Sequence, residues 1–316
     1  MLSGLFEQSS NGAKLIAAVF IILISILIFT VIGIILSFPL FSIDIEGLEV
    51  LMNTQDYSNI GFMKYLQTVI SLGTFVVPPF IIAYVFKGQI AEYLFLNKNP
   101  HLFPILLVAI IMIMAIPFIN FLAEWNSKLS LPEWLSGIEN FMKTAEKDAE
   151  KLVLAFLKAD GLGTLFINLF IIALIPAVGE ELLFRGVFQR IITDWTRNAH
   201  VGVWIAAFMF SAMHFQFYGF VPRMLMGVLF GYLLVWSKNM WLPIVAHFVN
   251  NAFAVIAYYL MDKSVIGDGA ETMGTGDNYF IAALVSITLV ILLTYIFFRY
   301  QKELKEIQEH KNLNMN

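Results

Sequence analysis

The chain has 316 residues, of which 59% are hydrophobic and only 13% are charged, and its formal net charge is -4. Soluble domains carry about 25% charged residues, so this composition indicates an integral membrane protein. Neither sign of charge clusters into a block, and we therefore expect no nucleic-acid partner. Because the chain contains no cysteine, disulfides, thiolate metal sites and cysteine nucleophiles are excluded.

Apolar runs separated by polar segments predict an all-α, polytopic membrane bundle with about eight transmembrane helices. The predicted spans are residues 15–41, 65–86, 102–123, 162–188, 200–217, 219–237, 240–261 and 279–298. The first run is too long for a signal-peptide core and has no small-residue cleavage site after it. We therefore expect it to remain as the first span.

Basic residues near the ends of the spans would fall on one side of the membrane: Lys14, Lys87, Lys98, Arg190, Arg197, Lys238, Arg299, Lys302 and Lys305. An excess of Lys and Arg marks the cytoplasmic side. This pattern predicts a multi-pass protein of the plasma (inner) membrane with both termini in the cytoplasm. The segment 124–160 runs against the rule, since it places lysines on the outer side, although its acidic residues outnumber them.

Segment 130–158 predicts one amphipathic helix outside the membrane. Ser130 and Glu133 form a capping-box pattern with Pro132 in the first turn, so the helix should begin there. Apolar residues then recur at helical spacing opposite a charged face: Trp134, Ile138, Phe141, Met142 and Ala145 against Glu139, Lys143, Lys147 and Glu150. The helix could lie on the membrane surface, pack on the ends of the spans, or act as a lid over a substrate entrance.

Three ionisable residues, Glu180, Glu181 and Arg185, lie inside the apolar run 162–188. A charge at the bilayer centre costs roughly 2.5 to 3.5 kcal/mol, so such residues are rare and indicate a functional site by default. Glu181 and Arg185 are four residues apart and should form an ion pair, which could also be purely structural. Glu180 points about 100° away around the helix and is free to face a cavity.

Two other apolar runs also contain polar side chains at helical spacing. His247 and Asn251 are four residues apart and should lie on one helix face, and so should Phe210 and His214. By contrast, we interpret Arg223, near a span end, as a side chain that reaches out to water. Gly227 and Gly231 indicate close helix packing without a chemical role.

In this order, the residues resemble the three motifs of the CPBP family of intramembrane proteases. Glu180, Glu181 and Arg185 resemble the EExxxR motif, Phe210 and His214 the FxxxH motif, and His247 and Asn251 the HxxxN motif. This family includes the CAAX prenyl endopeptidases and bacterial relatives linked to bacteriocin self-immunity. The ordered set is more specific than any single motif, and it extends from roughly residue 165 to residue 255.

The resemblance implies an endopeptidase that hydrolyses a peptide bond with an activated water molecule. Glu180 would activate the water, His214 would help to hold it, and His247 with Asn251 would stabilise the oxyanion. Glu181, Arg185 and Phe210 would support the site. On this reading, residues 162–262 form a catalytic core of four spans within one integrated membrane domain. Residues 1–161 add three spans and the amphipathic helix, and residues 263–316 add the last span and a charged cytoplasmic tail.

The cofactor remains open at this point. Glu180, His214 and His247 have the ligand types of a zinc site, and the family has been described as metal-dependent. There is no HExxH helix, however, and a glutamate with histidines can activate water directly, so we favour no cofactor and keep zinc as the alternative.

The expected partners are a peptide or membrane-protein substrate and the lipid bilayer; the oligomeric state is open. Two other functions are compatible with the same residues. One is a non-catalytic scaffold or immunity factor, and the other is a proton-coupled transporter, which the lack of a repeated half disfavours.

Overall fold

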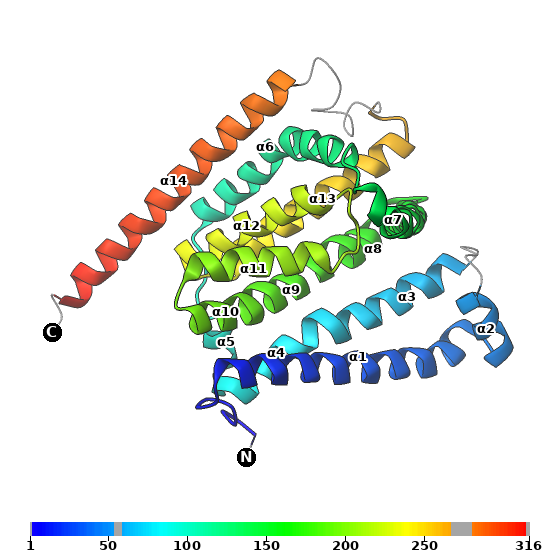
Figure 1. The fold of residues 1–316 in the computed structure, drawn as a ribbon, viewed down its shortest axis with the longest axis horizontal. Helices are drawn as coiled ribbons and strands as arrows, with labels where there is room; N and C mark the ends of the chain where they lie inside the picture. The colour runs from blue at the N-terminus through cyan, green and yellow to red at the C-terminus, as the bar shows by residue number, and fades with distance from the viewer. Residues whose placement is uncertain (1, 54–58, 267–279, 314–316) are drawn as a thin grey trace.

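The computed structural model describes residues 2–53, 59–266 and 280–313, and all regular elements within these ranges are helical (Figure 1). The α-helices are α1 (Asn11–Phe41), α2 (Ile45–Asn53), α3 (Ile60–Ser71), α4 (Val77–Lys87), α5 (Ile90–Tyr93), α6 (Leu102–Ser127), α7 (Ser136–Leu157), α8 (Leu162–Asn168), α9 (Ile175–Glu181), α10 (Gln189–Thr196), α11 (Ala199–Ala212), α12 (Phe220–Ser237), α13 (Trp241–Asp262) and α14 (Phe280–Leu313). The predicted all-α membrane bundle is confirmed.

Within the described part of the chain, seven helical segments are long and apolar enough to cross a membrane. The eighth predicted span, 200–217, corresponds to α11, which has only 14 residues. The expected length was wrong because the helix ends at Ala212 and Phe215 adopts a left-handed backbone conformation with φ 52°. The apolar residues after Ala212 therefore form a turn, and His214 lies in that turn just beyond the helix.

Two of the spans are continuous helices interrupted by π-helical turns. The first runs from α3 through Leu72–Val76 (η2) into α4, and the second from α8 through Leu169–Leu174 (η4), α9 and Leu182–Phe188 (η5) into α10. A proline lies in the first turn of both α4 and α9. Proline has no N–H to donate, and local widening of the helix before it accommodates the lost bond. Two π-helical turns thus flank the short helix that contains Glu180 and Glu181.

The helices form one bundle, and Glu181, Arg185 and His247 are buried inside it. α1, α3 and α4 lie along one side, and α6 and α14 lie along the opposite side (Figure 1). Between these sides, α9 packs on α13, and α12 packs on both α11 and α13. Both termini lie at the same end of the bundle (Figure 1). The division into 1–161, 162–262 and 263–316 remains an interpretation of this arrangement.

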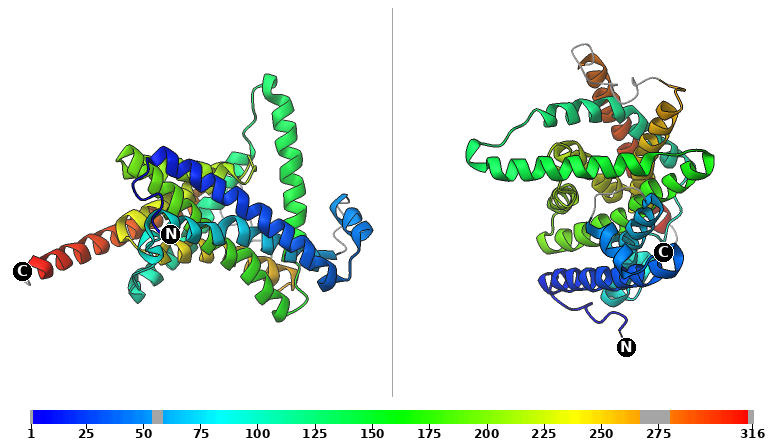
Figure 2. Two further views of the ribbon diagram at one scale, coloured as in Figure 1. Left: turned by 90° about the horizontal axis from the view of Figure 1, so that it is seen from below. Right: turned by 90° about the vertical axis from the view of Figure 1, so that its right-hand side faces the viewer.

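The predicted amphipathic helix is present, but it begins later than its capping-box pattern indicated. Glu133 opens a 3-10 turn, Glu133–Leu135, and α7 starts at Ser136. A different side chain caps this segment, because Oε2 of Glu139 accepts the backbone N–H of Leu131 at 3.1 Å. The helix crosses one end of the bundle at a steep angle to the spans (Figure 2). Its apolar face is open, with Trp134 80% and Phe141 70% exposed.

Candidate active site

The ion pair predicted between Glu181 and Arg185 is present in the middle of the bundle. Nη1 of Arg185 donates to Oε1 of Glu181 at 2.9 Å, and both side chains are fully buried. The guanidinium lies over the rings of Phe210, at 4.6 Å from the centroid, and Phe230, at 5.4 Å. Its Nη2 donates to the carbonyl oxygen of Gly227 at 3.1 Å. Arg185 therefore joins three helical segments around one buried carboxylate.

His247 connects this pair to Glu180. Its Nδ1 lies 2.8 Å from Oε1 of Glu181, and its Nε2 lies 3.9 Å from Oε2 of Glu180. Because Glu181 already accepts from Arg185 and an ionised carboxylate only accepts, we assign a hydrogen to Nδ1 of His247. The imidazole stacks on Phe230, with ring centroids 5.4 Å apart and planes inclined by 24°. The His247 ring is thus held at its edge by the hydrogen bond to Glu181 and on its face by Phe230.

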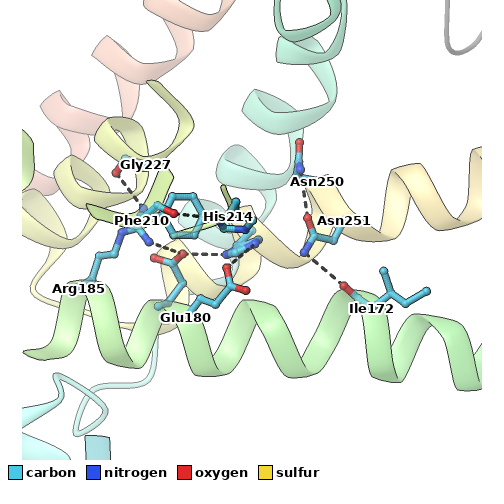
Figure 3. A network of polar contacts seen from close by, with 10 residues as sticks. Ile172, Glu180, Arg185, Phe210, His214, Gly227, Asn250 and Asn251 are labelled. Carbon is cyan, nitrogen blue, oxygen red and sulfur yellow. Dashed lines mark hydrogen bonds and ion pairs between the residues drawn. The ribbon is translucent and has the colours of Figure 1, made fainter. Parts of the chain in front are cut away.

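Glu180 differs from its neighbour in exposure. Its side chain is 12% exposed, whereas that of Glu181 is 0% exposed. Successive helical residues point about 100° apart, which separates the two carboxyl groups. Figure 3 shows Glu180 directed toward the histidines and away from the α9 backbone. Glu180 is therefore the less enclosed of the two acidic side chains.

His214 lies at the end of α11, and Phe210 holds it in place. The carbonyl oxygen of Phe210 accepts from Nδ1 of His214 at 2.8 Å, which leaves Nε2 available (Figure 3). The Phe210 ring contacts both histidines edge-on, with centroid distances of 5.2 Å to His214 and 5.8 Å to His247. Phe210 therefore contacts both imidazoles of the second and third motifs.

Asn251 lies further from the carboxyl groups than the resemblance implied. It is one turn along α13 from His247, and Figure 3 shows it beside Ile172 and away from Glu180. Its Nδ2 donates to the carbonyl oxygen of Ile172 at 3.4 Å, which is a long hydrogen bond. Its Oδ1 accepts from Nδ2 of Asn250 at 3.2 Å. Ile172 belongs to the π-helical turn η4, where backbone carbonyls lose their regular helical partners.

The side chains do not fit a zinc site as they are arranged here. A catalytic zinc needs three protein ligands at about 2.0 to 2.2 Å from one point. Across residues 2–53, 59–266 and 280–313, no group of three or more His, Asp or Glu side chains is positioned to hold a metal ion. We therefore derive no chemical step through a metal.

Two residues of this region were misjudged from the sequence. Arg223 does not simply extend into water: it is only partly exposed, its Nη2 donates to Oε1 of Gln216 at 2.5 Å, and its Nη1 is buried without a hydrogen-bond partner among the described residues. Gly227 has a polar role through its carbonyl oxygen, which accepts from Arg185. A Cβ on Gly227 would lie 3.2 Å from Nη2 of Arg185.

Together, the fold and the site define an integral, multi-pass membrane protein with a cluster of carboxyl groups and histidines enclosed by its helices. Residues 162–253 match the family described as type II CAAX prenyl endopeptidase Rce1-like. The chain therefore contains an Rce1-like domain, and this domain includes all seven residues of the three motifs.

The sequence is also similar to the uncharacterized protein YpbD of Bacillus subtilis (strain 168). The two are 32% identical over 89 residues, which is 27% of this chain and 42% of that protein. The chain thus matches less than half the length of this relative. No solved structure matches the chain.

Proposed function

We propose that this protein is an intramembrane endopeptidase that hydrolyses a peptide bond with a water molecule activated by Glu180. The observation that supports this most directly is the contrast between the two neighbouring carboxyl groups. Glu181 is bound by Arg185 and His247, whereas Glu180 is less enclosed and its Oε2 lies 3.9 Å from Nε2 of His247. The Rce1-like match of residues 162–253 supports the same class of reaction.

In this mechanism, Glu180 removes a proton from the water while the water oxygen bonds to the scissile carbonyl carbon. Nε2 of His214 helps to hold that water. Glu180 then returns the proton to the amide nitrogen as the carbon–nitrogen bond breaks, so that a carboxylic acid and an amine leave. His247 stabilises the oxyanion in between. That role needs a hydrogen on Nε2 as well as on Nδ1, so the imidazole is positively charged while it donates.

Asn251 would complete the oxyanion site by moving from the carbonyl oxygen of Ile172. Its present hydrogen bond of 3.4 Å is long, so little is lost when the amide turns toward a substrate.

We propose that the reaction uses no metal. Activity should then survive dialysis against a chelator, and the purified protein should contain no stoichiometric zinc. Loss of zinc together with activity, and recovery of activity on adding zinc, would contradict a metal-free reaction.

Comparison of the wild type with Glu180→Gln tests the proposal. Membrane fractions of cells that express either protein are compared by mass spectrometry of new peptide termini, with Glu303→Gln, an exposed acid near the C-terminal end of α14, as the control. We expect termini that depend on Glu180 and are unaffected by the control. Identical termini in all three strains, with normally folded Glu180→Gln protein, would favour a non-catalytic scaffold.

A further inference from the structure

The structure assigns a second binding function to the site, which rests on the proposed endopeptidase activity. We propose that Arg223 binds a carboxylate of the peptide substrate, either its free C-terminus or an acidic side chain close to the cleaved bond. Arg223 would then select which peptides are cleaved, while Glu180 and the histidines perform the reaction.

The first argument is an unused hydrogen-bond donor. Nη1 of Arg223 is buried and has no partner within the described residues, and such a donor is costly unless something fills the position. The guanidinium is also held in one orientation. Nη2 of Arg223 donates to Oε1 of Gln216 at 2.5 Å. The same nitrogen packs closely on Gly219, since a Cβ added to Gly219 would lie 3.0 Å from Nη2. The free nitrogen therefore has a fixed direction.

The second argument is position relative to the catalytic cluster. Arg223 and Gly227 are four residues apart on α12 and so lie on one face, separated by about 6 Å along the helix axis. Gly227 accepts from Arg185, which places this face of α12 against the buried ion pair. Gln216, the partner of Arg223, follows His214 by two residues in the same turn. Arg223 thus lies about one helical turn from the carbonyl that binds Arg185, and it contacts the turn that contains His214.

The third argument is access from outside the bundle. A groove of about 730 Å³ lies between α7 and the turn that follows His214. Its lining includes Lys143 and Glu146 of α7 together with Gln216 and Tyr218 of the turn. Gln216 lines this groove and also accepts from Nη2 of Arg223, so a peptide end that enters there would be separated from the guanidinium by this one side chain.

The chemistry of the ligand follows from the donor. A guanidinium presents planar N–H groups that match the two oxygens of a carboxylate, and such charge-assisted bonds are stronger than neutral ones.

A rival role for Arg223 is to balance the charge of Glu180, with which it interacts electrostatically. Yet no ion pair within 4.0 Å joins Arg223 to any carboxyl group in the described ranges. A charge-balancing residue would affect all peptides equally, which separates the two roles.

Cleavage assays test the difference. The probes are a dye-labelled, S-farnesylated peptide with a free C-terminus, its C-terminal amide, and an amide whose last residue is Asp. For the wild type, we expect kcat/KM to fall on the order of 10- to 100-fold from acid to amide, mainly through KM. Recovery with the Asp amide would identify an acidic side chain as the ligand. Arg223→Gln should cleave acid and amide equally, and Arg223→Lys should keep part of the preference because its charge remains.

A binding assay decides the question without relying on cleavage. Fluorescence polarisation of the same peptides is measured on full-length Glu180→Gln protein in nanodiscs, with and without Arg223→Gln or Arg223→Lys. Tighter binding of the acid that Arg223→Gln abolishes supports the proposal. Equal binding of acid and amide, or equal loss of both in each Arg223 variant, overturns it. If the acid is preferred but the wild type cleaves none of the peptides, the proposed endopeptidase activity fails while the carboxylate site stands.

Discussion

Residues 180 and 181 are chemically identical and adjacent, yet the bundle gives them different surroundings. Glu181 receives hydrogen bonds from Arg185 and His247 on one oxygen, and its side chain is fully buried. Glu180 keeps a partly exposed carboxyl group on another face of the helix. A buried charge needs such partners because its water shell is lost. The different roles proposed for Glu180 and Glu181 therefore follow from the angle of about 100° between successive side chains on a helix.

Replacing Arg185 by Met should destabilise the protein strongly, because it leaves the charge of Glu181 buried without its main partner. Breaking one side of a buried ion pair costs about 3–5 kcal/mol. The matched control is Arg299→Met, since Arg299 pairs with Glu303 at 3.8 Å with both side chains more than half exposed. Such surface pairs contribute about 0–1 kcal/mol. Thermal unfolding in detergent measures both variants, and equal small losses would show that the buried pair is not needed for stability.

Another buried cation links three helices away from the active site. Nζ of Lys64 on α3 donates to Oδ1 of Asn168 on α8 at 2.6 Å. Nδ2 of Asn168 donates in turn to the carbonyl oxygen of Leu157, the last residue of α7, at 3.0 Å. Lys64 is only 8% exposed and Asn168 is fully buried. This chain of bonds fastens the end of α7 to the membrane-embedded bundle.

Asn168→Leu should therefore destabilise the protein by about 1–3 kcal/mol or more, because the ammonium of Lys64 loses its partner inside the bundle. The double variant Lys64→Met with Asn168→Leu should recover part of that loss, since no unpaired charge then remains; the rest persists because the carbonyl oxygen of Leu157 still lacks the Asn168 amide. Thermal unfolding of the two single variants and the double variant gives the coupling between the sites. Strictly additive effects would mean that the two side chains do not act together.

At its other end, α7 holds the turn that follows His214. Oε2 of Glu146 accepts the backbone N–H of Tyr218 at 3.1 Å, and Oε1 of Glu139 accepts from the Tyr218 hydroxyl at 3.4 Å. The pKa of Glu139 is lowered, first by the hydrogen bond from Lys143 and then by those from Leu131 and Tyr218. The ionised form of Glu139 therefore favours the docked position of α7.

The lowered pKa of Glu139 determines how the contact between α7 and the turn after His214 depends on pH. A carboxyl group with a lowered pKa in the folded protein stabilises that state above its ordinary value of 4.5 and loses the effect as the pH falls through the lowered value. We expect hydrogen exchange at residues 215–219 to rise as the pH falls below about 4.5, after correction for intrinsic rates. Glu139→Gln should remove this dependence, whereas Glu150→Gln should retain it. An unchanged profile in Glu139→Gln would assign the effect to another acid.

At the scale of the whole molecule, periodic features were readable from the sequence and features that depend on packing were not. Apolar length gave the spans, and the spacing of Glu181 and Arg185 gave their ion pair, because both follow from helix geometry alone. The early end of α11 depends on one left-handed residue, Phe215, that no pattern marks. The buried Nη1 of Arg223 was missed because an arginine this close to a span end also suits a side chain that reaches water.

The arrangement of the spans also predicts how the protein lies in the membrane. Both termini lie at one end of the bundle and α7 crosses the other end (Figures 1 and 2). We propose that the end with the termini is cytoplasmic, because basic residues gather at the span ends there. Since the chain has no cysteine, Lys302→Cys on α14 and Lys147→Cys on α7 each create a unique labelling position.

A membrane-impermeant maleimide applied to spheroplasts should label Lys147→Cys and leave Lys302→Cys unlabelled, and both should react after the membrane is permeabilised. The physical reason is that translocating the basic end would move several positive charges across the bilayer. Labelling of Lys302→Cys alone in intact spheroplasts would invert the topology. The groove beside Arg223 would then open toward the cytoplasm, and the carboxylate-bearing peptides would have to come from that side.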